Sequence, residues 1–427
     1  KNPRRIRRRS RLLPAEKGVQ RMIAFNTARR IDRKIGKPLC GIVGLLRRFR
    51  GKKNVPNERI RKILIIKMWG LGTIVLASPV FANLKRNLPD CEIYFMTLRQ
   101  NRDMYEGSPH IDGAVYFDMS GWLRALRSFL KLVVWMWRQQ FDVVFDFEIG
   151  SRFTALLTAA NLRSMTIGYA PAGSGKNVFD ITIPYIESTH MTRIYLRSLD
   201  ALNMKIYDER LLKLPIKIEE KQYVNDFVKS QRLSNFVAFN PNTSDLAIER
   251  LWPPEYFAEL GKRLLDTFPD LQIVLIGAKA DVVRVMGLQK SIEISDRVVS
   301  TAGKFTIRET TELLSHARVL VSNDSGPMHL GVVAGVPTVG LFGPETPVLY
   351  GPRGDNHIAI TAGEMCSPCI SVYNEKVVDC CRGVVCMKNI SVESVFQAVV
   401  ERLAAVQPNV TFREFSELPL TKQRIDS

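Results

Sequence analysis

Hydrophobic positions between residues 61 and 147 alternate between short continuous runs and stretches with helical spacing. The run at 61–67 is typical of a strand buried on both faces, and a turn containing Gly70 and Gly72 follows it directly. Residues 73–88 carry apolar side chains at helical spacing. Further strand-like runs stand at 92–96, 114–117 and 142–147. The pattern predicts strands that alternate with helices.

A second series of the same kind begins at residues 235–240. Its later strand-like runs are 271–277, 319–322 and 338–342, and its helical stretches are 255–267, 307–317, 326–334 and 392–406. Two such series predict two parallel sheets with helices on both faces. The charged stretch 205–235 lacks long periodicity and is the predicted linker.

The predicted fold class is therefore α/β, with two doubly wound Rossmann-like domains facing a central cleft. Ligands of such sheets bind beyond the carboxyl ends of the strands. The predicted divisions are a basic arm at 1–57, an N-terminal domain at 58–216, a C-terminal domain at 217–406 and a tail at 407–427.

The excess positive charge lies at the start of the chain. Residues 1–62 contain 22 Lys and Arg against three acidic residues and so hold the whole formal net charge of +19. Basic residues interleaved with apolar ones predict that residues 1–57 form an arm on an anionic membrane surface, and a solvated arm is the alternative. Nucleic-acid binding is disfavoured because the arm has only two aromatic residues for base stacking.

The longest apolar stretches are too short or too charged to span a bilayer. Residues 122–137 are apolar but interrupted by Arg124, Arg127 and Lys131, which predicts a helix packed on the sheet, with a membrane-dipping helix as the alternative. No convincing secretory signal precedes the domains. We therefore expect a cytoplasmic protein, bound peripherally to the inner face of the cell membrane.

The strongest chemical signal lies at residues 321–329, where a predicted strand runs into a helix. Asn323, Asp324 or Ser325 can cap the helix, and Gly326 allows close approach to its backbone. A helix start of this kind binds anions, because free N–H groups and the positive end of the dipole face the ligand. His329 lies one turn further along. These residues predict a phosphate site, and a plain helix cap with a surface histidine is the alternative.

Four motifs together resemble glycosyltransferase family 9, the family of the ADP-heptose:lipopolysaccharide heptosyltransferases. They are residues 323–329 followed by Gly343 and Pro344, residues 240–242, residues 250–257, and the strand and glycine turn at 63–72. The resemblance implies a GT-B fold and a sugar transfer that inverts the anomeric carbon without a metal or other cofactor.

The resemblance also implies roles for individual residues. The nucleotide-sugar donor would be held by the C-terminal domain, with Asp324, Ser325, Gly326 and His329 at the diphosphate. Arg250 would lie beside them, where its guanidinium group can bind phosphate oxygens through two N–H groups at once. Asn240 would belong to the same site. The glycolipid acceptor would lie near Gly70 and Gly72.

Two departures from the family pattern affect this assignment. Family members often carry an Asp after the glycine turn as the proposed general base, whereas this chain has Thr73, which cannot be that base. Glu148 is the predicted substitute and Asp146 the second choice, because both stand at the end of a predicted strand. Some relatives use an acid for the donor ribose where this chain has Lys279. Either the nucleotide is not adenosine or Asp281 supplies that contact, and both residues are assigned to the donor site.

Five of the seven cysteines lie within 21 residues and include a Cys-x2-Cys pair. They are Cys366, Cys369, Cys380, Cys381 and Cys386. This spacing fits a structural zinc site, and a disulfide pair and free thiols are equal alternatives.

The sequence thus predicts an inverting glycosyltransferase that moves a heptose-like sugar from a nucleotide to a lipopolysaccharide-type glycolipid. A non-catalytic nucleotide-sugar-binding or scaffold protein is the main alternative, since Thr73 replaces the usual base. A nucleotide-sugar epimerase is a third, disfavoured by the motifs.

Overall fold

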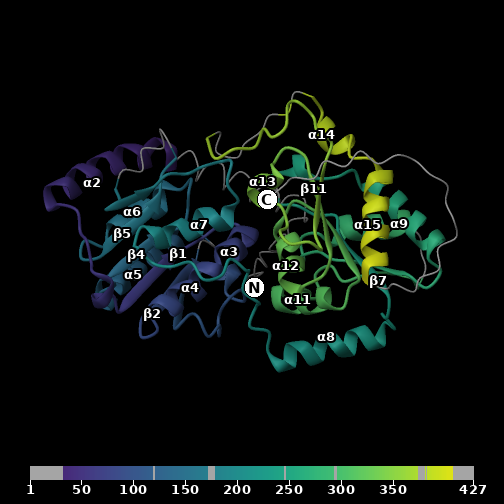
Figure 1. The fold of residues 1–427 in the computed structure, drawn as a ribbon, viewed down its shortest axis with the longest axis horizontal. Coiled ribbons are helices and arrows are strands. Elements are labelled where there is room, and N and C mark those ends of the chain that lie inside the picture. Colours follow the sequence, from purple (N-terminus) through teal and green to yellow (C-terminus); the bar gives the residue numbers. More distant parts are fainter. Residues whose placement is uncertain are drawn as a thin grey trace, which may run out of the picture.

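The computed structural model describes residues 32–118, 121–171, 178–244, 247–292, 296–373, 380 and 382–406. Two α/β domains lie side by side, the N-terminal one purple to blue and the C-terminal one green to yellow (Figure 1). The predicted fold class is confirmed. Residues 1–31 of the predicted arm and the tail at 407–427 lie outside the described residues.

The N-terminal sheet has six parallel strands, and β1 (Lys62–Ile66) lies at its centre between β2 and β4. Its strands in spatial order are β3 (Gly113–Phe117), β2 (Glu92–Leu98), β1, β4 (Val143–Asp146), β5 (Met165–Tyr169) and β6 (Ile181–Ile183). The register pairs Ile66 with Met96 on one side and with Asp146 on the other, so β1 and β4 end at the same height and β2 runs two residues further, to Leu98. The continuous apolar run of β1 is explained by burial on both faces.

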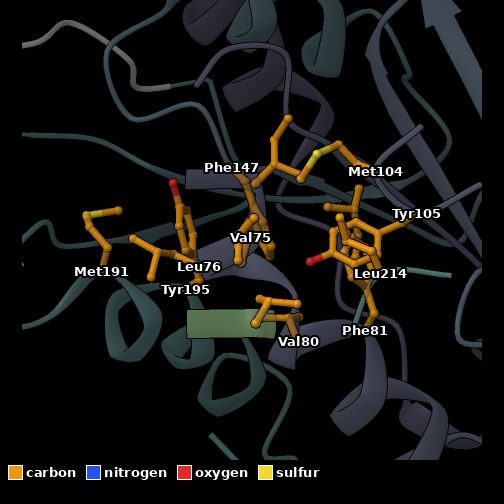
Figure 2. Packing of buried hydrophobic residues seen from close by; sticks show 14 of the residues in the cluster. Val75, Leu76, Val80, Phe81, Met104, Tyr105, Phe147, Met191, Tyr195 and Leu214 are labelled. Atoms are coloured by element: carbon orange, nitrogen blue, oxygen red, sulfur yellow. The ribbon is translucent and has the colours of Figure 1, made fainter. Parts of the chain in front are cut away.

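Alternate residues of β1 face two separate helical layers. Ile63 and Ile65 pack with α3 (Leu71–Ala77), α4 (Pro79–Asn87) and α7 (Met191–Asp200). Figure 2 shows Val75 of α3 and Tyr195 of α7 beside Phe147, and Phe81 of α4 beside Tyr105. The single helix predicted over 73–88 is divided, because Pro79 begins a second helix after Ser78.

The opposite layer contains α5 (Trp122–Gln139), α6 (Arg152–Ala159) and α2 (Lys37–Arg50). Leu64 and Ile66 pack with Leu132 of α5 and Leu157 of α6. Cys40 of α2 is buried against Ala155 and Ala159 of α6. The helix predicted over 122–137 is confirmed.

The C-terminal sheet repeats the topology of the first. Its parallel strands in spatial order are β12 (Ile358–Thr361), β11 (Thr338–Phe342), β10 (Val319–Asn323), β7 (Phe236–Asn240), β8 (Gln272–Leu275) and β9 (Val298–Ser300). The larger helices of this domain are α9 (Pro254–Thr267), α10 (Val282–Ile292), α11 (Ile307–Ser315), α12 (Gly326–Ala334) and α15 (Val392–Val406). In each sheet the first strand in the chain pairs with the second and the fourth, which is the Rossmann order.

Short helices complete the description. They are η1 (Asp32–Gly36), η2 (Asn57–Arg59), η3 (Arg99–Asn101), η4 (Ile248–Arg250), α13 (Pro347–Tyr350) and α14 (Val385–Lys388).

The stretch predicted as a linker, 205–235, contains the helix α8 (Ile218–Ser230). Only Val224 of α8 is fully buried, while Tyr223 and Phe227 pack edge-to-face on Phe305. Because the apolar contact of α8 is narrow, most of its charged side chains are in water. Its few apolar positions therefore do not produce a helical period that can be recognised in the sequence.

Part of the predicted basic arm is docked on the N-terminal domain. Arg47 of α2 donates to the Ala159 carbonyl at 2.9 Å and pairs with Asp180 at 2.9 Å, and Arg50 pairs with the same carboxylate at 2.6 Å. Asp180 is buried, so removing both arginines would leave an uncompensated buried charge. Among the described residues, no helix combines the length and apolarity needed to cross a bilayer.

Candidate functional site

The carboxyl ends of the central strands of the two sheets face each other. The helices that follow these strands, α3 after β1 and α12 after β10, are in contact. A Cβ atom on Gly72 would lie 2.5 Å from Cδ2 of His329 and 3.5 Å from Cα of Gly326. Only a glycine fits so close an approach. The structure therefore brings the glycine turn after β1 and the predicted phosphate loop after β10 together, although more than 250 residues separate them.

The phosphate loop is fixed by a buried amide. Asn240, at the end of β7, donates from Nδ2 to the hydroxyls of Ser322 and Ser325, both at 2.8 Å. Ser325 is the N-cap residue of α12, in extended conformation, and its side chain makes no cap hydrogen bond. Of the three predicted cap residues, Ser325 thus takes the N-cap position, and Asn240 orients its hydroxyl at the helix start.

Arg250 supplies the cation at this helix start. Its Nη1 lies 3.0 Å from Oδ2 of the buried Asp324. Burial lowers the pKa of Arg250, but the charges of Asp324 and Glu345 outweigh this effect and raise it above its usual value. Asp324 therefore acts as an anchor for Arg250, which keeps a positive charge next to the N-terminus of α12.

His329 lies buried in the first turns of α12. Burial lowers the pKa of His329 to about 4, so its ring is neutral at pH 7. Nδ1 is buried and has no hydrogen-bond partner among the described residues. A neutral ring of this kind can offer a hydrogen bond to a phosphate but no charge.

Lys279 and Asp281, both assigned to the donor site from the sequence, lie on the loop after β8. Lys279 is exposed, while Asp281 accepts a hydrogen bond from the Ala278 amide at 2.9 Å and closes the turn before α10. A Cβ atom on Gly277 would lie 2.9 Å from Nδ2 of Asn242, so this loop adjoins the end of β7.

In the N-terminal domain, the side chain of Glu148 holds the loop after β1 in place by hydrogen bonds. Its Oε1 atom accepts hydrogen bonds of 2.7 Å from Nζ of Lys67 and from the amides of Met68 and Trp69. Lys67 and Glu148 are both buried, and Lys67 also donates to the Trp69 carbonyl at 2.6 Å. The carboxylate thus determines the path of the chain into the glycine turn.

Asp146 and Thr73 have local roles in the structure. Asp146 is fully buried and accepts from the Glu148 amide at 3.0 Å and from the Thr154 hydroxyl at 3.2 Å. Thr73 donates to the carbonyls of Trp69 and Gly70 at 3.1 and 2.9 Å. Both side chains support the loops that carry Glu148 and the glycine turn.

Sequence reasoning missed Lys67, Glu345 and His190. His190 accepts from the Thr192 amide through Nδ1, so Nε2 carries the proton and donates to the Gly351 carbonyl at 3.0 Å, which ties the two domains together. Glu345 follows the Gly343 and Pro344 pair that the motif analysis singled out, and that position was the available signal.

The cysteine cluster lies beside the loop after β11. Burial, followed by the charges of Cys369, Cys366 and Cys380, raises the pKa of the Cys386 thiol to about 11. The described residues contain no group of three or more side chains able to hold a metal ion. Cys381, the fifth member of the predicted zinc site, lies outside the described residues, so zinc, a disulfide pair and free thiols all stay predictions for the cluster.

The model of glycosyltransferase family 9 (heptosyltransferase) matches residues 130–377. Lipopolysaccharide heptosyltransferase 3 of Escherichia coli (strain K12) is 22% identical over 306 residues, which cover 68% of this chain and 85% of the relative. Lipooligosaccharide heptosyltransferase 2 of Campylobacter jejuni subsp. jejuni is 24% identical over 313 residues, which cover 72% of this chain and 89% of the relative.

Solved structures show the same architecture. A family 9 glycosyl transferase from Veillonella parvula DSM 2008 superposes with a TM-score of 0.66 at 23% identity, covering 81% of this chain and 97% of the other. The E. coli ADP-heptose lps heptosyltransferase II gives a TM-score of 0.63 at 19% identity, covering 81% and 99%. With its two facing Rossmann-type domains, the chain belongs to glycosyltransferase family 9 and is a glycosyltransferase of GT-B fold.

Proposed function

We propose that the chain is an inverting heptosyltransferase that moves a heptose-like sugar from a nucleoside diphosphate donor to a lipopolysaccharide-type glycolipid. The observation that carries the proposal is the cationic helix start in the C-terminal domain, with Arg250 beside the N-terminus of α12, held against the glycine turn of the N-terminal domain. The names of the relatives support heptose as the sugar and lipopolysaccharide as the acceptor class.

The donor diphosphate would lie on the first turn of α12. Arg250 and the helix dipole would neutralise the negative charge that the leaving diphosphate gains as its bond to the anomeric carbon breaks. Ser325, oriented by Asn240, and the neutral ring of His329 would add hydrogen bonds. Lys279 and Asp281, on the neighbouring loop, are the proposed contacts for the nucleoside.

The acceptor hydroxyl would attack the anomeric carbon from the face opposite the diphosphate, so the configuration inverts. Its proton must pass to a base, and Glu148 is the proposed base because Thr73 cannot accept a proton at neutral pH. The hydrogen bonds at Oε1 support a second role for Glu148, in which the carboxylate positions the glycine turn for the acceptor. These two roles differ in their effect on the pH profile of turnover.

We also propose that residues 1–57 hold the enzyme peripherally on the anionic inner face of the cell membrane, where a glycolipid acceptor would be within reach. The excess positive charge of this segment supports the placement. The alternative of a non-catalytic scaffold is not favoured, because the chain belongs to a family of transferases.

Calorimetry with ADP, GDP and UDP tests the donor site. Asp324→Ala should weaken binding of the preferred nucleotide at least about tenfold, because Arg250 loses its anchor beside the helix start. Asp266→Ala, an exposed change on α9, is the matched control. Unchanged affinity in Asp324→Ala would remove the site, and absence of transfer from any nucleotide heptose would overturn the proposed reaction.

A further inference from the structure

The helix α5 exposes two adjacent stripes of opposite chemistry. One stripe is apolar and about half exposed: Leu123, Leu126, Leu130, Val134 and Trp137. The neighbouring stripe is basic and exposed: Arg124, Arg127, Lys131 and Arg138. The third face, with Leu132 and Met136, is buried on the sheet. A helix that is packed on one face and apolar on another has more hydrophobic surface than its own domain covers.

The helix α2 shows the same arrangement. Its inner face carries Cys40, Gly44 and Arg47, all buried against the domain. Its outer face carries Leu39, Ile42, Leu45, Leu46 and Phe49, and Phe49 is 83% exposed. Lys37 and Arg48 are exposed beside this face.

The carboxyl ends of α2 and α5 meet at the loop that follows α6. Nε1 of Trp137 donates to the Ala160 carbonyl at 2.9 Å, and Arg50 donates to the carbonyl of Leu162. Leu162 itself is 58% exposed and lies between the two ends. Both helices pack beside α6 in the same layer (Figure 1), and we call the outer residues of the two helices together the α2–α5 surface.

We propose that the α2–α5 surface docks on an anionic lipid bilayer. Neither helix contains an Asp or Glu, so every exposed charge on them is positive and complementary to anionic headgroups. The apolar stripes would enter the boundary between headgroups and acyl chains, as the apolar faces of interfacial helices do. Trp137, at the end of the stripe, suits the interface because its ring is amphipathic.

The surface is linked directly to the acceptor side of the site. Phe153 of α6 packs on Phe129 of α5, and its ring also lies 6.4 Å from that of Trp69, whose amide is held by Glu148. A bilayer on the α2–α5 surface would therefore lie against the layer that supports the glycine turn. This placement extends the docking region beyond residues 1–57, and it rests on exposed side chains and not on the proposed reaction.

Sedimentation of the full chain with vesicles tests the inference. The vesicles are phosphatidylglycerol mixed with phosphatidylcholine, or phosphatidylcholine alone, at low and high salt. High salt screens the contribution of the basic arm and leaves that of the apolar stripes. We expect the triple variants Leu126→Gln/Leu130→Gln/Val134→Gln and Ile42→Gln/Leu46→Gln/Phe49→Gln each to lower partitioning onto anionic vesicles at high salt about tenfold or more.

The control is Val283→Gln/Met286→Gln, which replaces exposed apolar residues of α10 in the other domain and should bind as the parent does. Equal binding by the parent and both triple variants would overturn the inference. So would a parent dimer in solution that the triple variants convert to a monomer, because a second copy would then cover the surface. Nucleotide affinity should stay unchanged in all variants. A loss of vesicle binding can then be distinguished from a failure of the donor site.

Discussion

The two domains share one topology but carry opposite chemistry at the same topological position. In the N-terminal domain the loops after β1 and β4 meet around a buried carboxylate, Glu148, that accepts hydrogen bonds from Lys67 and from the loop backbone. In the C-terminal domain the loops after β7 and β10 meet around a buried amide, Asn240, that donates to serine hydroxyls. A single scaffold thus provides an acid on one side and a cationic helix start on the other.

The difference matches the needs of a group transfer between an alcohol and a diphosphate. A proton must leave the acceptor, and a carboxylate can receive it or position the groups that do. Negative charge must accumulate on the leaving group, and Arg250 with the dipole of α12 can stabilise it. Changes on the N-terminal side should therefore affect turnover, and changes on the C-terminal side should affect donor affinity.

The largest expected effect is on turnover. Glu148→Gln should lower it by about 10²–10⁴-fold, the range typical of general acid–base groups, with donor affinity nearly unchanged. Steady-state assays across pH and calorimetry with the nucleotide are the measurements. If Glu148 is the base, the acidic limb of the pH profile disappears in the variant, whereas a purely positioning role keeps the limb and lowers the plateau.

Asp146→Asn is the matched control for this change. Its buried carboxylate bonds the Glu148 amide and the Thr154 hydroxyl, so the variant should disturb thermal stability more than the chemical step. Full turnover in Glu148→Gln would exclude both roles of the acid.

The next largest effect concerns the donor. Arg250→Ala should weaken nucleotide binding about 10–100-fold, because hydrogen bonds to charged groups contribute about 1.5–3 kcal/mol each. Arg250→Lys keeps the positive charge but loses the two-point hydrogen bonding of the guanidinium group, so its nucleotide affinity should lie between those of the parent and Arg250→Ala. A loss of turnover in Arg250→Ala with parental nucleotide affinity would contradict the division of roles between the domains.

The contact between the domains can be tested by adding one methyl group. Gly72→Ala would place a Cβ atom 2.5 Å from the His329 ring, so the two loops must separate, and turnover should fall about tenfold. Gly41→Ala on α2 meets nothing within 4 Å and is the matched control, expected to keep parental turnover. Equal turnover in both variants would show that the chemistry does not need the observed approach of α3 to α12.

The central strands could be predicted from the sequence because they are buried on both faces. Continuous apolar runs in the sequence correspond to β1, β4, β7 and β10. The residues just after these strands include most of the candidate site. The outer strands β6 and β9 span only three residues each, and β12 is mostly half-buried, so their apolar signal is too short to recognise.

The candidate residues could be named from the sequence, but their partners could not. Lys67 stands 81 residues before Glu148, and only the register that pairs Ile66 with Asp146 brings them together. The Asn240 amide and Ser325 likewise meet through the pairing of β7 with β10. Their partners depend on strand order, which a single sequence does not specify.

The smallest expected effect is the pH dependence of stability that His329 of the C-terminal domain causes. Burial lowers the pKa of His329 to about 4, whereas an unfolded histidine titrates near 6.5. The unfolded chain therefore binds the proton more tightly, so the free energy of unfolding is complete above pH 6.5 and decreases as the pH falls toward 4. The decrease is at most about 3 kcal/mol for one such histidine.

His190 should contribute in the same direction, because burial also lowers its pKa to about 4. His329→Gln removes one of the groups that act in this direction, so its stability should fall less steeply than that of the parent between pH 6.5 and 4. Urea-induced unfolding at pH 7, 6 and 5 measures the difference, with His316→Gln on the partly exposed end of α11 as the control. If the parent and His329→Gln lost stability in parallel over this range, the His329 ring would titrate in the folded protein as it does in the unfolded chain, and below about pH 6.5 it could carry a second positive charge beside Arg250.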